Sequence, residues 1–146
     1  MEALFAALEQ AFADYRTDLE NYEKKSKPTD GLLGFGHSLR DDACHERLDE
    51  RIERTVAGIR EAKPDTNQAE RAVRLLLYQG KRTDWPLAAQ WMLRAVERHA
   101  LPLIPFLSKD DASAFLQDYT SRYRPWDRLP AQKQVYKALK AQSREK

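Results

Sequence analysis

The feature that most constrains the fold of this chain is the spacing of its apolar residues, which recur every three or four positions through most of its 146 residues. In the first segment this stripe comprises Leu4, Leu8, Phe12, Tyr15, Leu19 and Tyr22. Such spacing places the apolar side chains along one side of an α-helix. No segment shows the polar and apolar alternation with β-branched enrichment that indicates a half-buried strand. The sequence therefore predicts an all-α fold.

Prolines, glycines and capping residues divide the chain into about six predicted helices, as in an irregular helical bundle. The expected helices cover approximately residues 2–25, 41–62, 67–79, 84–99, 109–123 and 130–142. The residues expected to cap helix starts are Ser38 or Asp41, Asn67 with Glu70, Thr83 or Asp84, and Ser108 with Asp111. These capping types satisfy backbone N–H groups that have no partner within the helix.

Two connecting segments stand out. Residues 26–40 include three glycines, whose permissive backbones indicate a loop. Residues 101–107, LPLIPFL, are apolar but carry two prolines, each of which removes a backbone donor. We therefore expect residues 101–107 to form a buried extended connector. A chain of this length can bury one core, which predicts a single helical domain over residues 1–146.

Charge is unevenly distributed. The formal net charge is +2, yet residues 122–146 hold eight Lys and Arg against two acids, a local charge of +6 that leaves −4 for the remainder. The single cysteine cannot form an internal disulfide, and neither a secretory leader nor an apolar run of about 18 residues is apparent. We therefore expect a cytoplasmic protein with no membrane segment and a basic C-terminal segment.

The stretch GLLGFGHSLRDDACHERLDER, residues 31–51, is the first candidate site, because it concentrates glycine, histidine, acids and the only cysteine. On a helix, Asp41, His45 and Asp49 follow one another at four-residue steps, which stacks their side chains on one face. His37 adds a further ligand from the preceding segment. Histidine and carboxylates in this arrangement can hold a divalent metal, and a metal-bound water would supply hydrolytic chemistry. The hypothesis is a metal or small-ligand site.

The competing interpretation of this stretch is structural. Asp41 would cap the second helix, and His45 would be a half-buried histidine bonded to a neighbouring carboxylate. The glycines would let Leu32 and Phe35 fold over the core. No complete signature such as HExxH or a paired CxxC supports the metal hypothesis, and short clusters of this kind often occur without any ligand. We expect Cys44 to be a buried structural residue on the apolar stripe.

The basic C-terminal segment is the second candidate site. Its patch comprises Arg122, Arg124, Lys133, Lys137 and Lys140, interleaved with Tyr123 and Trp126. Cations bind phosphates and aromatic rings stack on bases, so this pattern favours nucleic-acid binding. The structural alternative is a solvated helix face beside aromatic side chains that fill a corner after Pro125. The overall charge lacks the strong excess that is typical of nucleic-acid-binding domains.

Three classes of function therefore remain open. The first is a non-enzymatic helical interaction or regulatory module that binds a protein partner or a second copy of the chain. It rests on the amphipathic helices and on the tryptophans Trp85, Trp91 and Trp126, which lean toward exposed positions. The second is the divalent-metal site, and the third is nucleic-acid binding. The sequence favours the first of these classes over an enzyme.

Overall fold

The computed structural model describes residues 1–25, 35–82, 84–86 and 89–144, with the side chains of 22–25, 35–42 and 80 excepted. Within these ranges the protein is all-α and contains no strand, which confirms the predicted fold class. The α-helices are α1 (Glu2–Lys25), α3 (Phe35–Glu61), α4 (Thr66–Tyr78), α5 (Gln90–Ala95), α6 (Lys109–Arg122) and α7 (Pro130–Arg144). None of the helices in this part of the chain combines the length and apolar character that crossing a lipid bilayer demands.

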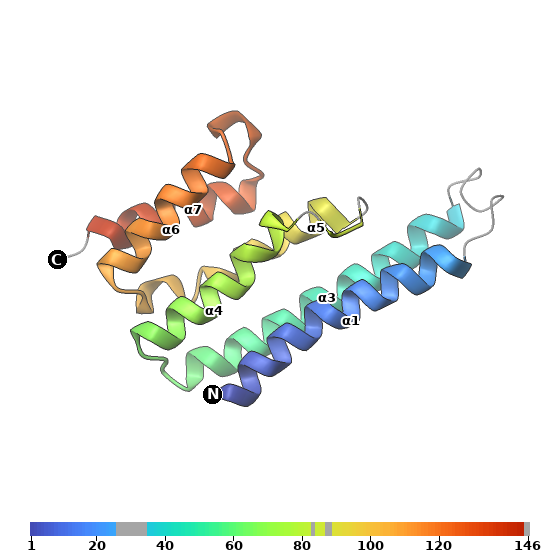
Figure 1. Ribbon diagram of the computed structural model, residues 1–146, viewed down its shortest axis with the longest axis horizontal. Coiled ribbons are helices and arrows are strands. Elements are labelled where there is room, and N and C mark those ends of the chain that lie inside the picture. Colours follow the sequence, from blue (N-terminus) through green and yellow to red (C-terminus); the bar gives the residue numbers. More distant parts are fainter. Residues whose placement is uncertain (26–34, 83, 87–88, 145–146) are drawn as a thin grey trace. The chain divides into compact units, whose positions relative to one another are not determined.

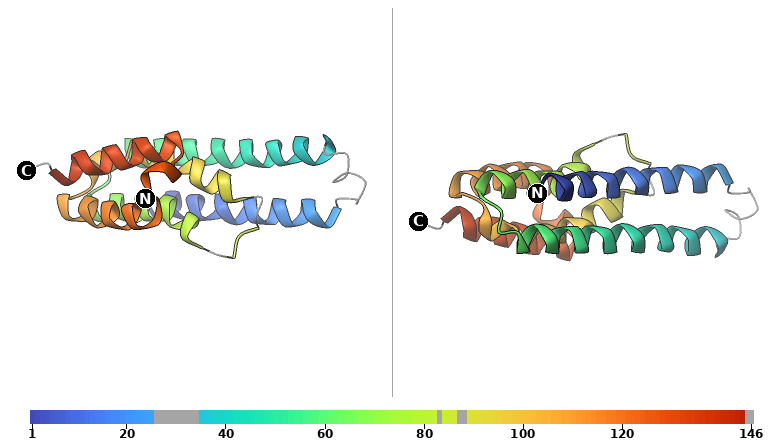
Figure 2. Two further views of the ribbon diagram at one scale, coloured as in Figure 1. Left: turned by 90° about the horizontal axis from the view of Figure 1, so that it is seen from above. Right: turned by 90° about the horizontal axis from the view of Figure 1, so that it is seen from below.

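The contacts group into two compact units, and each is described by itself. The first unit, residues 2–55, is an antiparallel pair formed by α1 and most of α3 (Figures 1 and 2). Its apolar stripe is buried at Leu8, Leu19, Leu48 and Ile52, as the spacing predicted. Ion pairs join the two helices beside this stripe, with Arg51 Nη1 2.6 Å from Asp14 Oδ2. We call this unit the hairpin.

The second unit, residues 56–146, holds the remaining helices. Short 3₁₀ helices connect them: η1 (Gln79–Lys81), η3 (Val96–Ala100), η4 (Ile104–Phe106) and η5 (Pro125–Asp127). Helices α6 and α7 pack against each other, and η3 packs against both α4 and α7. The helix η3 therefore lies at the centre of this unit, which we call the C-terminal unit.

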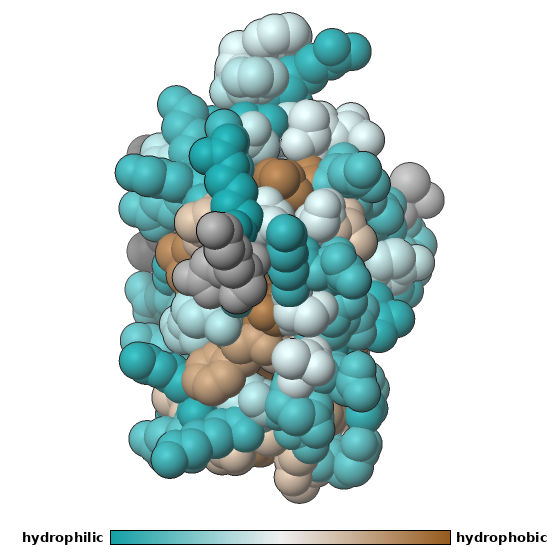
Figure 3. All heavy atoms as spheres, turned by 90° about the vertical axis from the view of Figure 1, so that its left-hand side faces the viewer, coloured by the Kyte–Doolittle hydropathy of each residue, from teal (hydrophilic) through white to brown (hydrophobic). Residues whose placement is uncertain are grey.

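In the space-filling view, hydrophilic side chains cover most of the visible surface, and hydrophobic ones show between them (Figure 3).

The start of α3 differs from the predicted boundary, because the helix begins at Phe35 instead of residue 41. Residues 35–40 of the expected loop are therefore helical, and that part of the prediction is wrong. This part of the helix includes Gly36, and one glycine costs about 1 kcal/mol relative to alanine, which is too little to stop a long helix. The other half of the expected loop, residues 26–34, lies outside the described residues.

The start of α4 is also shifted. The N-cap is Asp65, whose carboxylate accepts from the Gln68 backbone N at 2.8 Å, while Gln68 Oε1 accepts from the Asp65 N at 3.0 Å. The predicted pair Asn67 and Glu70 is therefore wrong, although the kind of motif is right. The predicted cap of α6 is confirmed at Ser108, whose Oγ accepts from the Asp111 N at 3.1 Å.

The segment before α5 departs most from expectation, since the helix predicted for residues 84–99 begins only at Gln90 and becomes 3₁₀ at Val96. The N-cap of α5 is Ala89 and not the predicted Asp84, whose carboxylate binds Arg82 through two hydrogen bonds of 2.7 and 3.1 Å. Trp85 is buried, and its indole N–H donates to Gln79 Oε1 at 3.3 Å. The inference that Trp85 leans toward solvent is therefore wrong.

Residues 101–107 are buried in part, as expected, but they are not extended. They form a turn followed by η4, in which the backbone N of Phe106 donates to the Leu103 carbonyl and that of Leu107 to the Ile104 carbonyl, both at 3.0 Å. Proline suits the first position of a helical turn, where its missing N–H is not needed. From α7, Gln142 Nε2 donates to the Leu107 carbonyl at 2.8 Å and so holds this segment in place.

Candidate functional site

The predicted junction site is only partly within the described side chains. His45 is buried in the hairpin, and its ring centroid lies 5.7 Å from that of Tyr15. Cys44 beside it is also buried, and its Sγ accepts a hydrogen bond from Arg47 Nη2 at 3.6 Å. Asp49 is half-buried. The side chains of His37 and Asp41 lie outside the described residues.

No group of three or more His, Cys, Asp or Glu suited to a metal ion occurs among the side chains that are described. Since His37 and Asp41 are not among them, the metal site at His37, Asp41, His45 and Asp49 stays a prediction. A metal that binds only the native state must raise its stability. The hypothesis therefore requires that Zn²⁺ raise the thermal midpoint of metal-stripped protein and that His45→Ala abolish the rise.

The C-terminal unit contains a buried polar cluster that sequence reasoning missed. Its centre is Glu97 of η3, which is fully buried. The Glu97 carboxylate accepts hydrogen bonds from Tyr119 Oη of α6 at 2.6 Å and from Oη of Tyr123, the C-cap of α6, at 3.1 Å. From α7, Gln132 Nε2 donates to the same carboxylate at 3.4 Å. The cluster therefore joins η3, α6 and α7 through a single carboxyl group.

Two arginines complete this cluster. Arg94 donates to Gln132 Oε1 through Nε at 3.1 Å and Nη2 at 2.7 Å, and its Nη2 also donates to the Asp127 carbonyl. Arg122 donates from Nη1 to Tyr123 Oη at 3.2 Å, and its guanidinium lies 5.0 Å from the centre of the Tyr123 ring. The cations thus polarise the groups that bind the buried carboxylate.

The cluster changes the acidity of its members. Burial raises the pKa of Glu97 from 4.5 to about 7, although the hydrogen bonds from the two tyrosines and Gln132 and the charge of Arg122 oppose this rise. Burial and the adjacent Glu97 raise the pKa of Tyr123 to about 12 and also raise the pKa of Tyr119. Because Glu97 and Gln132 have no exposed surface, solutes cannot reach them. The cluster therefore holds helices together and does not present a reactive group.

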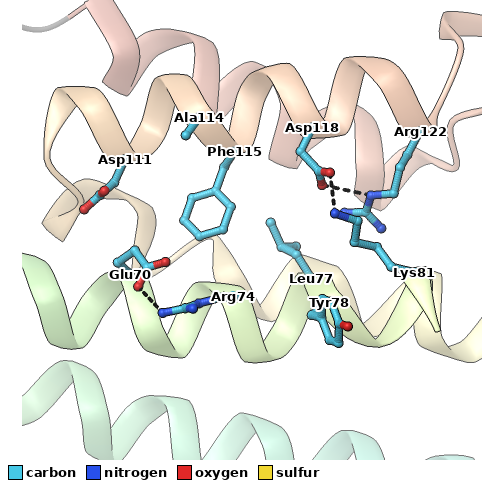
Figure 4. Close-up of a pocket in the computed structure, with 10 residues that line it drawn as sticks. All are labelled: Glu70, Arg74, Leu77, Tyr78, Lys81, Asp111, Ala114, Phe115, Asp118 and Arg122. Atoms are coloured by element: carbon cyan, nitrogen blue, oxygen red, sulfur yellow. Dashed lines mark hydrogen bonds and ion pairs between the residues drawn. The ribbon is translucent and has the colours of Figure 1, made fainter.

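An accessible site lies between α4 and α6, which run in the same direction (Figure 4). It is an open groove of about 320 Å³, and we call it the groove. The groove is lined by Glu70, Arg74, Leu77, Tyr78, Lys81, Asp111, Ala114, Phe115, Asp118 and Arg122. Its middle is apolar, because Leu77 and Phe115 face it from opposite walls (Figure 4). Tyr78, which also lines the groove, is 51% exposed.

Charged side chains are ordered along the groove. Asp111 and Glu70 lie at the end where both helices begin, and Lys81 and Arg122 lie at the end where both helices finish (Figure 4). This order suits the two helix dipoles, which favour acids at N-termini and cations at C-termini. The groove therefore has an acidic end and a basic end, with apolar side chains between them.

Ion pairs fix the walls of the groove. At the basic end, Asp118 is 2.6 Å from Lys81 Nζ and 3.0 Å from Arg122 Nε, so it joins α6 to η1. Burial alone would raise the pKa of Asp118, but the hydrogen bonds and charges of these two cations outweigh it and hold that pKa below its ordinary value. On the other wall Arg74 Nη2 is 2.6 Å from Glu70 Oε2.

The predicted basic patch is divided by the structure. Arg122 is not part of an exposed surface, because its side chain is only 15% exposed and is held between Asp118 and the tyrosines of the polar cluster. Arg124, Lys133 and Lys137 are exposed, and Lys140 is half-buried. Of the remaining tryptophans, Trp91 is 54% and Trp126 82% exposed, as predicted.

Comparison of the chain with protein-family models, with curated proteins and with solved structures finds no match. The chemistry of the sites above is therefore the only guide to function.

Proposed function

We propose that this protein is a non-enzymatic helical binding module that receives an amphipathic helix of a partner protein in the groove between α4 and α6. The observation that carries the proposal is the apolar part of the groove lining, in which the side chains of Phe115 and Tyr78 are partly exposed to solvent. Exposed apolar surface that is framed by polar residues is typical of protein interaction sites.

The size of the groove supports a side chain as its occupant. At about 320 Å³ it lies at the lower limit of pockets that enclose small molecules, which measure about 300–1,000 Å³. An amphipathic helix inserts apolar anchors spaced three or four residues apart and leaves the rest of its surface outside. An open groove with a short apolar middle therefore suits one or two such anchors.

Charge complementarity orients the partner helix. The acidic end, at Glu70 and Asp111, favours a Lys or Arg of the partner, and the basic end, where the side chain of Lys81 is exposed, favours a Glu or Asp. The anchors would pack on Phe115 between them. The groove therefore selects a helix with a basic residue before or after its anchors and an acidic residue on the other side.

A displayed library tests this proposal. Its members are helical peptides with two apolar anchors four residues apart and random residues at both flanks, sorted for binding to the full chain. We expect enriched peptides to carry opposite charges at the two flanks. Phe115→Ala should weaken their binding about 30-fold, as removal of a hot-spot residue does.

Phe106→Ala is the matched control, because it also removes a half-buried phenyl ring but lies in η4, outside the groove lining. It should leave peptide binding unchanged. Lys81→Glu should reverse the preferred charge at the basic end. Equal loss of binding in the two phenylalanine variants, or enrichment without any charge order, would contradict the proposal. If no peptide binds but the chain associates with itself, and Phe115→Ala abolishes this association, the occupant of the groove would be a second copy of the chain and not a partner protein.

A further inference from the structure

The corner between α6 and α7 displays the most exposed large hydrophobic residue among the described side chains. Trp126 is 82% exposed and lies in the turn η5. The turn is held at both sides, because the Asp127 N donates to the Arg124 carbonyl at 2.9 Å and Arg94 donates to the Asp127 carbonyl. A tryptophan normally buries its ring, so a ring held on a fixed turn in solvent is available to a ligand.

Cations alternate with aromatic rings from this corner into α7. The Arg124 guanidinium lies 5.9 Å from the centre of the Trp126 ring. Farther along, Arg128 lies 4.1 Å and Lys140 Nζ 6.0 Å from the centre of the Tyr136 ring. These distances are in the range of cation–π contacts, so each aromatic ring has a positive charge beside it.

The outer face of α7 continues the positive charge. Lys133 and Lys137 are exposed, while Val135 and Leu139 on the opposite side of the helix are buried. From Lys133 to Lys140 the helix rises about 10 Å, so these cations form a short row. We call the surface formed by Arg124, Trp126, Arg128, Lys133, Lys137 and Lys140 the basic corner.

We propose that the basic corner binds single-stranded nucleic acid, with Trp126 stacking on an unpaired base and the cations contacting phosphates. This site is separate from the groove and does not depend on the function proposed for it. Proteins that bind single strands combine the same two elements, a row of cations and exposed aromatic rings. An acidic peptide would use the cations but would leave the Trp126 ring without a stacking partner, and a duplex keeps its bases stacked on one another.

Fluorescence anisotropy of a labelled 20-nucleotide oligo(dT) tests the proposal on the full chain. Trp126→Ala should weaken binding about tenfold, as loss of one stacked base does, and Trp126→Phe should retain most of the affinity. Log affinity falls linearly with log salt, and each phosphate contact on a single strand adds about 0.7 to the magnitude of this slope. Replacement of Lys133, Lys137 and Lys140 by Gln should therefore reduce the magnitude of the slope by about 2.

The matched control replaces three other exposed cations, Arg54, Arg60 and Lys109, by Gln. It removes the same charge from elsewhere on the chain and should leave the salt slope unchanged. The proposal is overturned if oligo(dT) does not bind, if Trp126→Ala binds as tightly as the wild type, or if the control lowers the salt slope as much as the lysine variant. Equal or tighter binding of polyglutamate or of a duplex of the same length would also overturn it.

Discussion

The hairpin and the C-terminal unit both bury the inner faces of their helices, but the side chains that they bury differ in kind. In the hairpin the buried stripe is mainly apolar, and its ion pairs lie at the margin, where Arg51 and Asp14 remain partly exposed. In the C-terminal unit a carboxyl group, Glu97, lies at the centre with no exposed surface. An apolar stripe tolerates many combinations of side chains, whereas a buried carboxyl group requires particular donors at particular distances. We therefore expect the C-terminal unit to be the more sensitive to a single substitution.

Glu97→Ala should have the largest effect on stability. It leaves the hydroxyls of Tyr119 and Tyr123 and the amide of Gln132 without their common acceptor and opens a small cavity, and we expect a loss of about 4 kcal/mol in the free energy of unfolding. Glu97→Gln, which keeps an acceptor oxygen, should cost less. Urea unfolding followed by circular dichroism measures both. A loss in Glu97→Ala no larger than in Glu97→Gln would show that the hydrogen bonds do not hold the unit together.

Ile52→Ala probes the apolar core of the hairpin. Ile52 has no exposed surface, and we expect its truncation to cost about 3.5 kcal/mol, while Ile52→Val should cost about 1 kcal/mol. Both losses should be the same at pH 5 and pH 8, because the substitutions change no charge.

The same two variants test the predicted single domain. Helix α3 runs without interruption across the boundary between residues 55 and 56, so we expect one unfolding transition for the whole chain. Ile52→Ala and Glu97→Ala should then shift the same transition. Two separate transitions, each shifted by only one variant, would make the hairpin and the C-terminal unit independent domains.

The pH dependence of stability should distinguish the two units. In the unfolded chain Glu97 releases its proton near pH 4.5, whereas the folded protein retains that proton up to about pH 7. Between these values the unfolded state binds fewer protons, so the contribution of Glu97 is fully present below pH 4.5 and is lost as the pH rises to about 7. The loss should reach up to about 3 kcal/mol, since each unit of pKa is worth about 1.4 kcal/mol.

Glu97→Gln supplies the control for this pH dependence, because the difference between wild type and variant isolates one group. The pKa values of Asp14 and Asp118 are lowered, so their contributions act in the opposite direction and are lost only as the pH falls below about 3.8. Thermal midpoints between pH 4.5 and 8 measure the difference. A constant difference across this range would mean that the buried carboxyl group titrates as it does in the unfolded chain.

The same contrast explains what could be predicted from the sequence. The spacing of apolar residues was sufficient to predict the helices α1, α4, α6 and α7, because each carries an uninterrupted apolar stripe. A signal for the polar cluster was also present. Glu97 occupies an apolar position between Leu93 and Ala100, and Gln132 does so before Val135 and Leu139. A polar residue in such a position indicates a buried polar group that needs partners.

The partners themselves could not be predicted. Tyr119 and Gln132 lie 22 and 35 positions from Glu97, and no local pattern encodes which helix faces which. The groove was missed for the same reason, since it arises from the separation of α4 and α6. At the predicted junction the sequence correctly placed Cys44 and His45 on the inward face of the helix. The start of α5 was predicted six residues too early, because Asp84 was taken as its cap, whereas the N-cap is Ala89.

The smallest effect should come from the ion pairs at the margin of the hairpin. Arg47 Nη2 is 3.3 Å from Asp18 Oδ2, and both side chains are substantially exposed, so solvent and salt screen their attraction. A double-mutant cycle with Arg47→Ala and Asp18→Ala should give a coupling energy of about 0.3 kcal/mol that disappears in 1 M salt. A coupling energy as large as the loss of stability in Glu97→Ala would contradict this comparison. The hairpin would then depend on a specific polar contact, as the C-terminal unit does.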